Sequence, residues 1–334
     1  MNIMAYLTYL RPAFKANPIT LILLGLLCIS RVVYADPIRI AVSLTPLSLP
    51  FYVADEMGYF EDYQVPVQLI PIMGGHRAFN MLQEGRADLA TSSETVVMFN
   101  SFKYDNYAIL ATFVNCLDDI KLITHPDSGI NALIQLKEKK IGIVKGSASH
   151  YFLSTLLELN GLNSDNVTLI DLKPEEMLKQ LAAHTVDAVA IWEPFAYQIL
   201  KVLPNAQIKS PTGQYRLTFN LIRSERSKAQ HQEAISRVLY ALSDAEGFIY
   251  EHPEKAQHIL KERLHLDQGF IDWIWPSLDY GLMLDQSLLF TLESEARWAK
   301  REGFVDNMKY INYLNYIDQA PLKHLKPSSI SILE

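Results

Sequence analysis

From Pro37 onward, short β-branched apolar runs alternate with stretches in which apolar residues recur every three or four positions. The first pattern is typical of buried strands and the second of amphipathic helices. The first cycle predicts strand 38–44, helix 50–58, strand 65–72, helix 76–84 and strand 87–90. Such alternation favours a parallel sheet covered by helices.

A second cycle of the same kind begins near residue 140. It predicts strand 140–144, helix 148–160, strand 168–171, helix 174–184 and strand 187–192. Pro174 suits the first turn of a helix, and Gly161 suits a helix end. Segments 109–124 and 216–223 are interpreted as extended chain that crosses between the cycles, so we expect two α/β lobes.

After the second crossing, the pattern changes to helices without strands. The expected helices cover 232–250, 253–264, 267–278 and 286–302, and we expect them to pack around the first lobe. The tail from Asp306 contains aromatic residues without a clear period, and we assign it no element.

The N-terminus has the pattern of a secretory signal. Arg11 and Lys15 precede an apolar run over 19–30, and Val33-Tyr34-Ala35 offers a cleavage site, which predicts a signal peptide over 1–35 and a periplasmic protein. A membrane anchor needs about 20 apolar residues, and Arg31 interrupts this run first. Retention in the membrane by an uncleaved signal stays open.

Charge and cysteine content narrow the possible partners. Removal of Arg11, Lys15 and Arg31 with the signal leaves 27 basic and 37 acidic residues, a formal charge of −10, which makes nucleic acid an improbable partner. Cys116 is the one cysteine after residue 35, so no internal disulfide can form there. We expect Cys116 to be a small buried apolar residue.

Ligands of open parallel sheets bind beyond the carboxyl ends of the strands. This rule selects candidate binding residues in both cycles: Thr45, Ser48, Gly75, His76, Ser92, Ser93, Glu94, Ser147, Ser149, His150, Tyr151, Trp192 and Glu193. The most informative segment is 145–151, where a glycine turn leads into a helix with two serines at its start. Free N–H groups and the helix dipole make this a natural anion site, although Ser147 or Ser149 could instead cap the helix.

Alternatives stay open for the other candidates. Glu193 could accept from a ligand or pair with a cation, or it could cap the helix that begins at Pro194. Trp192 could offer its ring to a ligand or pack in the core. The hydroxyls over 92–95 could donate to a ligand or start the next helix.

Catalytic and metal-binding signatures are missing from the sequence. It contains no phosphate-binding loop, Gly-x-Ser-x-Gly, His-Glu-x-x-His or spaced cysteine pair. The histidines are scattered without ligand spacing. We therefore expect no metal, no cofactor and no enzyme.

Several motifs together resemble those of the nitrate/sulfonate/taurine-type solute-binding proteins of ABC transporters. These proteins are related to thiamine-pyrimidine and riboflavin-binding proteins. The motifs are Gly58-Tyr59-Phe60-Glu61, Leu82 to Ala90, Gly146-Ser147 through Leu153, Val186-Asp187-Ala188, Trp192-Glu193-Pro194, and the helical stretches 245–249 and 252–256.

The resemblance implies a type II periplasmic-binding-protein fold, an α/β fold of two lobes joined by two crossing strands. Lobe 1 would comprise 36–118 and 219–334, with its helical C-terminal region packed on it, and lobe 2 would comprise 119–218. The protein would be a monomer that binds a small, partly anionic organic ligand, such as a sulfonate or a pyrimidine, and delivers it to ABC permease and ATPase subunits. A thiamine-pyrimidine synthase-like enzyme and the ligand-sensing partner of a signalling protein are the alternatives.

Overall fold

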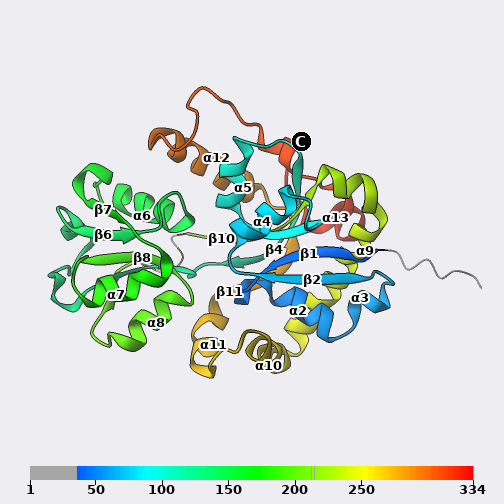
Figure 1. Ribbon diagram of the computed structural model, residues 1–334, viewed down its shortest axis with the longest axis horizontal. Coiled ribbons are helices and arrows are strands. Elements are labelled where there is room, and N and C mark those ends of the chain that lie inside the picture. Colours follow the sequence, from blue (N-terminus) through cyan, green and yellow to red (C-terminus); the bar gives the residue numbers. More distant parts are fainter. Residues whose placement is uncertain (1–35, 212, 214, 334) are drawn as a thin grey trace, which may run out of the picture. The chain divides into compact units, whose positions relative to one another are not determined.

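The computed structural model describes residues 36–211, 213 and 215–333 (Figure 1). The predicted signal peptide lies outside the described residues. The described chain contains two β-sheets, each covered by helices. Within the described ranges, no helix combines the length and the apolar character needed to cross a bilayer.

The larger sheet has six strands in the order β11-β4-β10-β3-β1-β2, and we call it with its helices lobe 1. Its strands are β1 (Ile38–Ser43), β2 (Val67–Ile72), β3 (Leu89–Ser93), β4 (Tyr107–Cys116), β10 (Leu217–Ser224) and β11 (Leu278–Met283). β1 pairs in parallel with β2 and β3, whereas β10 runs antiparallel to β3 and β4. All residues of β4 and β10 are buried, as expected for strands covered on both faces.

The helices of lobe 1 come from both ends of the described chain. They are η1 (Pro46–Ser48), α2 (Leu49–Glu56), α3 (Tyr59–Asp62), α4 (Gly75–Gln83), α5 (Glu94–Ser101), α9 (Glu225–Glu251), α10 (Pro253–Leu264), α11 (Gln268–Ile274), η6 (Trp275–Ser277), α12 (Gln286–Arg301), η7 (Tyr313–Tyr316), α13 (Ala320–Leu325) and η8 (Pro327–Ser329). Their apolar faces join the strands in one continuous core. The helical C-terminal region therefore packs on lobe 1, as the resemblance implies.

The smaller sheet has five strands in the order β7-β6-β8-β5-β9, and we call it with its helices lobe 2. Its strands are β5 (Ile120–Thr124), β6 (Lys140–Ile143), β7 (Thr168–Asp171), β8 (Ala188–Trp192) and β9 (Gln207–Ile208). Its helices are η2 (Pro126–Ser128), η3 (Leu133–Leu136), α6 (Ala148–Leu159), η4 (Ser164–Asn166), η5 (Pro174–Glu176), α7 (Met177–Ala182) and α8 (Phe195–Val202).

Alternate residues of the lobe 2 strands face two separate cores. In β8, Ala188 and Ala190 pack with α6, whereas Val189 and Ile191 pack with α7 and α8 on the other face (Figure 1). The two-residue period of a strand produces this division. Lobe 2 is therefore a sheet between two helical layers.

Two short segments join the sheets. β4 of lobe 1 ends at Cys116 and β5 of lobe 2 begins at Ile120, while the return runs from Ile208 in β9 to Leu217 in β10. Both crossings therefore fall within or beside the segments that the sequence indicates. Cys116 is fully buried, as expected.

The prediction of helices alone after the second crossing is wrong. The helix expected over 267–278 ends at Ile274, because Pro276 follows and has no N–H to continue it. β11 then pairs antiparallel with β4. The helix expected from 232 begins earlier, at Glu225, with non-helical angles at His231 (φ −135°, ψ 26°).

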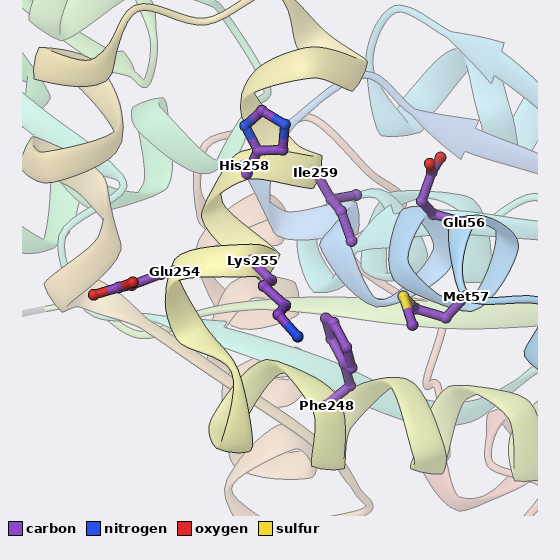
Figure 2. Close-up of a pocket in the computed structure, with 7 residues that line it drawn as sticks. All are labelled: Glu56, Met57, Phe248, Glu254, Lys255, His258 and Ile259. Atoms are coloured by element: carbon purple, nitrogen blue, oxygen red, sulfur yellow. The ribbon is translucent and has the colours of Figure 1, made fainter.

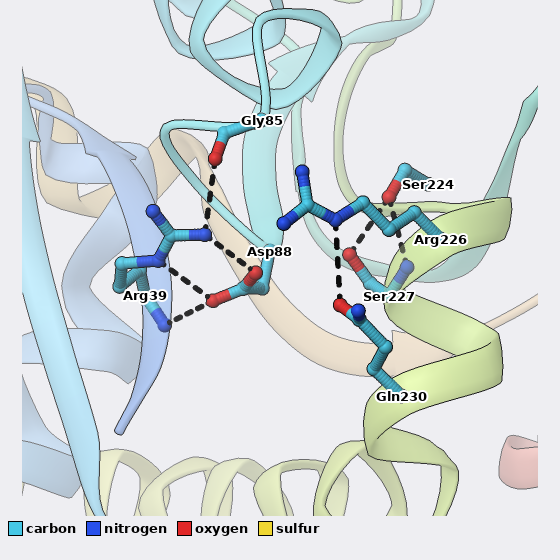
Figure 3. Close-up of polar contacts among 7 residues, drawn as sticks. All are labelled: Arg39, Gly85, Asp88, Ser224, Arg226, Ser227 and Gln230. Atoms are coloured by element: carbon cyan, nitrogen blue, oxygen red, sulfur yellow. Dashed lines mark hydrogen bonds and ion pairs between the residues drawn. The ribbon is translucent and has the colours of Figure 1, made fainter. Parts of the chain in front are cut away.

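The motif over 82–90 has a structural role in lobe 1. Arg39 of β1 donates to Asp88 through Nη2 at 2.8 Å and through Nε at 3.0 Å, and Nη2 also reaches the Gly85 carbonyl at 3.1 Å (Figure 3). Gly85 has a φ of +69°, and a Cβ there would lie 2.7 Å from Nη1 of Arg226. This motif therefore stabilises the turn before β3 through packing and ion pairing.

Candidate functional site

The ends of β3 and α4 meet closely in lobe 1. A Cβ on Gly75 would lie 2.8 Å from Oγ of Ser92 and 3.0 Å from its Cα, so only glycine allows this approach. Ser92 is fully buried, and its Oγ has no hydrogen-bond partner among the described residues. His76 lies beside this corner but is exposed.

The loop after β1 supplies two more of the predicted hydroxyls. Oγ1 of Thr45 accepts from the Leu47 N–H at 3.4 Å and so begins η1. Ser48 is fully buried, and its Oγ, like that of Ser92, meets no partner in the described part of the chain. A buried hydroxyl without a partner is unusual and is often completed by water or a ligand.

Glu94, at the start of α5, is fully buried and accepts from three groups. Thr218 donates to its Oε2 through both N and Oγ1 at 2.8 Å, and the Tyr215 hydroxyl donates to its Oε1. Ser93 precedes it as the N-cap residue without a side-chain cap bond. Tyr215 comes from the return crossing, so this contact connects the crossing to α5.

A second buried carboxyl, Glu295 of α12, lies beside the same tyrosine. Its Oε1 is 2.6 Å from Oγ1 of Thr95 and 3.2 Å from the Tyr215 hydroxyl, while its Oε2 is buried without a partner among the described residues. Burial raises the pKa of Glu295 well above its usual value, and the charge of Glu94 adds to the effect. Burial also raises the pKa of Glu94, against the hydrogen bonds that favour its ionised form. Both carboxyls therefore favour their neutral forms, and Glu295 does so more strongly.

The start of α6 in lobe 2 holds four predicted residues. Oγ of Ser147 donates to the Val144 carbonyl at 2.7 Å and lies 2.9 Å from Oγ of Ser149, so Ser147 does not cap the helix through its side chain. Nδ1 of buried His150 accepts from the Gly146 N–H at 3.3 Å. The neutral ring therefore carries its proton on Nε2, which has no partner in the described chain.

This end of α6 packs against lobe 1. The rings of His150 and Tyr151 lie 5.2 Å and 5.4 Å from Trp298 of α12, and Tyr151 lies 5.8 Å from Tyr215. Burial lowers the pKa of His150 to about 4. The structure thus brings the 147–151 segment and the Glu94–Tyr215–Glu295 group to the same junction between the lobes.

Glu193 has a different setting, because protein groups engage both of its oxygens. Oε1 lies 2.9 Å from Nζ of Lys121 and accepts from Nε1 of Trp273 at 2.7 Å. Oε2 accepts from the Tyr197 N–H at 2.9 Å, which is the capping contact considered for this residue. Half-buried Trp192 packs with its ring 6.5 Å from Phe195, in the core of lobe 2.

Asp119, in the first crossing, is a residue that the sequence reasoning missed. It is 7 % exposed, and its carboxyl makes no hydrogen bond to a described residue. Burial, followed by the charge of Glu193, raises its pKa to about 8. The pair Asp118-Asp119 directly after an apolar run was the available signal; Tyr215 and Glu295 offered none.

A hollow of about 450 Å³ lies elsewhere on lobe 1, between the end of α2 and α10 (Figure 2). Its walls include Met57, Phe248, Lys255 and Ile259, and none of its lining residues was predicted to bind ligand. No three His, Cys, Asp or Glu side chains within the described ranges are grouped to hold a metal ion. The candidate site is therefore the junction between the lobes.

Comparison with known proteins relates this architecture to solute-binding proteins. A Bacillus subtilis (strain 168) protein named "Putative aliphatic sulfonates-binding protein" is 27 % identical over 246 residues, which cover 70 % of this chain and 72 % of that protein. The periplasmic aliphatic sulphonate binding protein of Escherichia coli superimposes with a TM-score of 0.74 and 17 % identity, over 85 % of this chain and 97 % of that one.

The same fold also occurs in an enzyme. A desulfurization enzyme superimposes with a TM-score of 0.63 and 14 % identity, over 87 % of this chain and 98 % of that chain. These structural likenesses establish the periplasmic-binding-protein fold of two α/β lobes. The NMT1/THI5-like family profile matches residues 45–256, the greater part of the chain, and this protein belongs to that family.

Proposed function

We propose that the chain is the exported solute-binding component of an ABC importer, which captures a small organic ligand between its lobes. The observation that carries the proposal is the meeting of buried polar side chains from both lobes beside the two crossings. The family and the sulfonates-binding relative support it. For this function we keep the expected division into 36–118 and 219–334 for lobe 1 and 119–218 for lobe 2, except that residues 217 and 218 go to lobe 1 because β10 begins at Leu217.

The polar groups beside the crossings suggest the chemistry of the ligand. The hydroxyls of Ser48 and Ser92 are buried donors without a partner in the described chain, and they suit a ligand oxygen such as that of a sulfonate. The carboxyl of Asp119 lacks a hydrogen-bonding partner among the described residues and suits a donor or cationic end. An aminosulfonate combines both ends, and a pyrimidine with an amino group is the second class to test.

The mechanism is closure about the two crossings. A ligand that contacts both lobes binds the closed form more tightly than the open form, so it shifts the population toward closure. The permease then recognises the closed form. In this mechanism Tyr215 connects the return crossing to α5 and α12 through Glu94 and Glu295.

The first test is native mass spectrometry of the full protein, purified from the periplasm, before and after denaturation. We expect a discrete small molecule to be released. Taurine, ethanesulfonate and an aminopyrimidine are then titrated into the emptied protein by calorimetry. If none of these probes binds and no molecule is released, the solute-binding proposal fails.

Ser92→Ala tests the placement of the ligand. Because Oγ of Ser92 has no partner among the described residues, its removal leaves protein hydrogen bonds intact, and we expect ligand affinity to fall about tenfold with little change in melting temperature. Ser236→Ala is the control, because that hydroxyl contacts the Gln232 carbonyl of its own helix, α9. Unchanged affinity in Ser92→Ala would remove this residue from the site.

The same experiment separates binding from catalysis. A binding protein returns the titrated probe unchanged in mass, whereas an enzyme converts it.

Fractionation of cells, with the periplasmic and membrane fractions compared, tests export and retention by the signal. Co-purification of permease and ATPase subunits with the ligand-loaded protein tests the transport partners.

A further inference from the structure

Helix α11 belongs to lobe 1 but contacts lobe 2. Phe270 and Ile274 of α11 lie in the core of lobe 1. From the same helix, Trp273 donates its indole N–H to Oε1 of Glu193 at 2.7 Å. Asp267, the N-cap of α11, lies 3.2 Å from the Tyr197 hydroxyl and 3.4 Å from Nζ of Lys201 in α8. This helix therefore meets lobe 2 at the end of β8 and along α8.

The carboxylate of Glu193, which accepts from the indole, forms a buried ion pair with Lys121 of lobe 2, and we call these two residues the Glu193–Lys121 pair. Both side chains are 1 % exposed, and their charged atoms lie 2.9 Å apart. Lys121 also reaches the backbone carbonyl of Asp118 and its carboxylate at 3.3 Å. A buried pair of this kind is tolerated only when its remaining hydrogen-bonding positions are filled.

Trp273 comes from a helix of lobe 1, whereas Glu193, Lys121 and Tyr197 belong to lobe 2 and Asp118 lies in the first crossing. If the lobes separate, Glu193 retains its ion pair with Lys121 and its hydrogen bond from the Tyr197 N–H, and water replaces the indole as a donor. The pair therefore stays satisfied, and the indole contact can be broken at modest cost. Nζ of Lys121 also lies 5.2 Å from the centre of the Trp273 ring, a cation–π contact that separates with it.

We propose that Trp273 is a positioning residue for ligand capture: its indole holds α11 of lobe 1 on the Glu193–Lys121 pair of lobe 2 in the closed form. The inference rests on the proposed function, since ligand capture requires closure. It also explains why Glu193 has no free oxygen for a ligand. The contact adds stability to the closed form alone, so it sets how much of the ligand-free protein is closed.

The test measures closure directly. Labels are attached to Ile134→Cys in lobe 2 and Phe290→Cys in lobe 1, both at exposed positions, in a Cys28→Ser background where the remaining Cys116 is buried. Distances between the labels are measured with and without taurine or the molecule released from the native protein. The variant Trp273→Phe keeps an aromatic ring at this position but removes the N–H donor.

We expect Trp273→Phe to lower the closed-to-open ratio of the ligand-free protein about tenfold to a hundredfold, since a hydrogen bond to a charged group is lost. Trp275→Phe is the matched control, because the Trp275 ring packs 6.0 Å from Tyr280 within lobe 1. An unchanged ratio in Trp273→Phe would overturn the inference. Failure of any probe to shift the wild-type distances would instead count against the proposed function.

A double-mutant cycle distinguishes a specific contact from general packing. Glu193→Gln keeps an acceptor oxygen but removes the charge, so Trp273→Phe in that background should change the ratio by less than in the wild type. Equal changes in both backgrounds would show that Trp273 acts without Glu193 and would also overturn the inference.

Discussion

At the junction between the lobes, the carboxyl groups of Glu94, Glu295 and Asp119 are buried and form no ion pair with a described side chain. Lys121 pairs with Glu193 and Asp118, and its charge offsets the effect of burial on the pKa of Asp119 only in part. Burial disfavours the ionised form of such groups. Burial therefore raises the pKa of Asp119 to about 8 and the pKa of Glu295 well above its usual value.

Asp119→Asn should flatten the pH dependence of stability. Folding raises the pKa of this carboxyl from 3.8 to about 8, so the stability that its neutral form contributes is full below pH 4 and is lost as the pH rises toward 8. Urea unfolding at pH 5 and pH 8 should show a fall in wild-type stability about 3 kcal/mol larger than in the variant. Exposed Asp165→Asn should leave the fall unchanged.

His150→Asn tests a group whose pKa is lowered on folding, so its effect on stability has the opposite pH dependence to that of Asp119. Burial lowers the pKa of His150 from 6.5 to about 4, so its contribution to stability is present above pH 6.5 and is lost as the pH falls toward 4. Asn can still accept from Gly146 but does not titrate. The acid-side loss between pH 6.5 and 4.5 should be about 2 kcal/mol smaller in the variant, whereas exposed His324→Asn should behave like the wild type. Equal losses in His150→Asn and the wild type would refute this assignment.

At the scale of elements, helix starts were well predicted where turn chemistry and apolar periodicity agree. α6 and α10 begin at 148 and 253, as the sequence predicts, because a glycine turn precedes one and Pro253 opens the other. α11 ends four residues earlier than predicted, because Pro276 follows it, and β11 lacks a clear strand pattern in the sequence. Its place in the sheet depends on pairing with β4, which is distant in the chain.

Two glycine-to-alanine substitutions in helices of lobe 1 should change the free energy of unfolding in opposite directions. Gly75→Ala at the start of α4 would place a Cβ 2.8 Å from Oγ and 3.0 Å from the Cα of Ser92, so we expect a loss of about 1–3 kcal/mol in unfolding free energy. Gly247→Ala inside α9 meets nothing within 4 Å and should gain about 0.5–1 kcal/mol through helix propensity. Urea unfolding measures both, and a shift of the same sign would contradict the packing at Ser92.

At the scale of the whole described molecule, contacts from the crossings connect the two lobes. The ring of Tyr215 lies 5.8 Å from Tyr151 of lobe 2, while its hydroxyl contacts Glu94 and Glu295 of lobe 1. Trp273 and Glu193 connect the lobes at α11 and the end of β8. Polar contacts and aromatic packing therefore connect the lobes, whose fully buried residues form separate cores.

Tyr215→Phe should weaken both stability and closure. The ring remains, but Oε1 of Glu94 loses the hydroxyl that donates to it, and an unpaired buried acceptor costs about 1–3 kcal/mol. Urea unfolding and the interlobe label distances report the two effects. Tyr104→Phe, at a position that is 42 % exposed, is the control and should change neither. A Tyr215 variant as stable as the control would show that its hydroxyl contributes nothing.

The two α/β cycles, the crossings and most helices could be predicted from the sequence alone, because these depend on local periodicity and turn residues. The sequence also indicated which loops meet beyond the strands. The partners of individual side chains emerge only in the folded structure: Glu193 pairs with Lys121 and Trp273, and Tyr215 contacts both Glu94 and Glu295. These partners lie 72 to 121 residues apart along the chain, so no local pattern records them. Burial, which sets the pKa of Asp119 and His150, likewise arises only when distant elements exclude water.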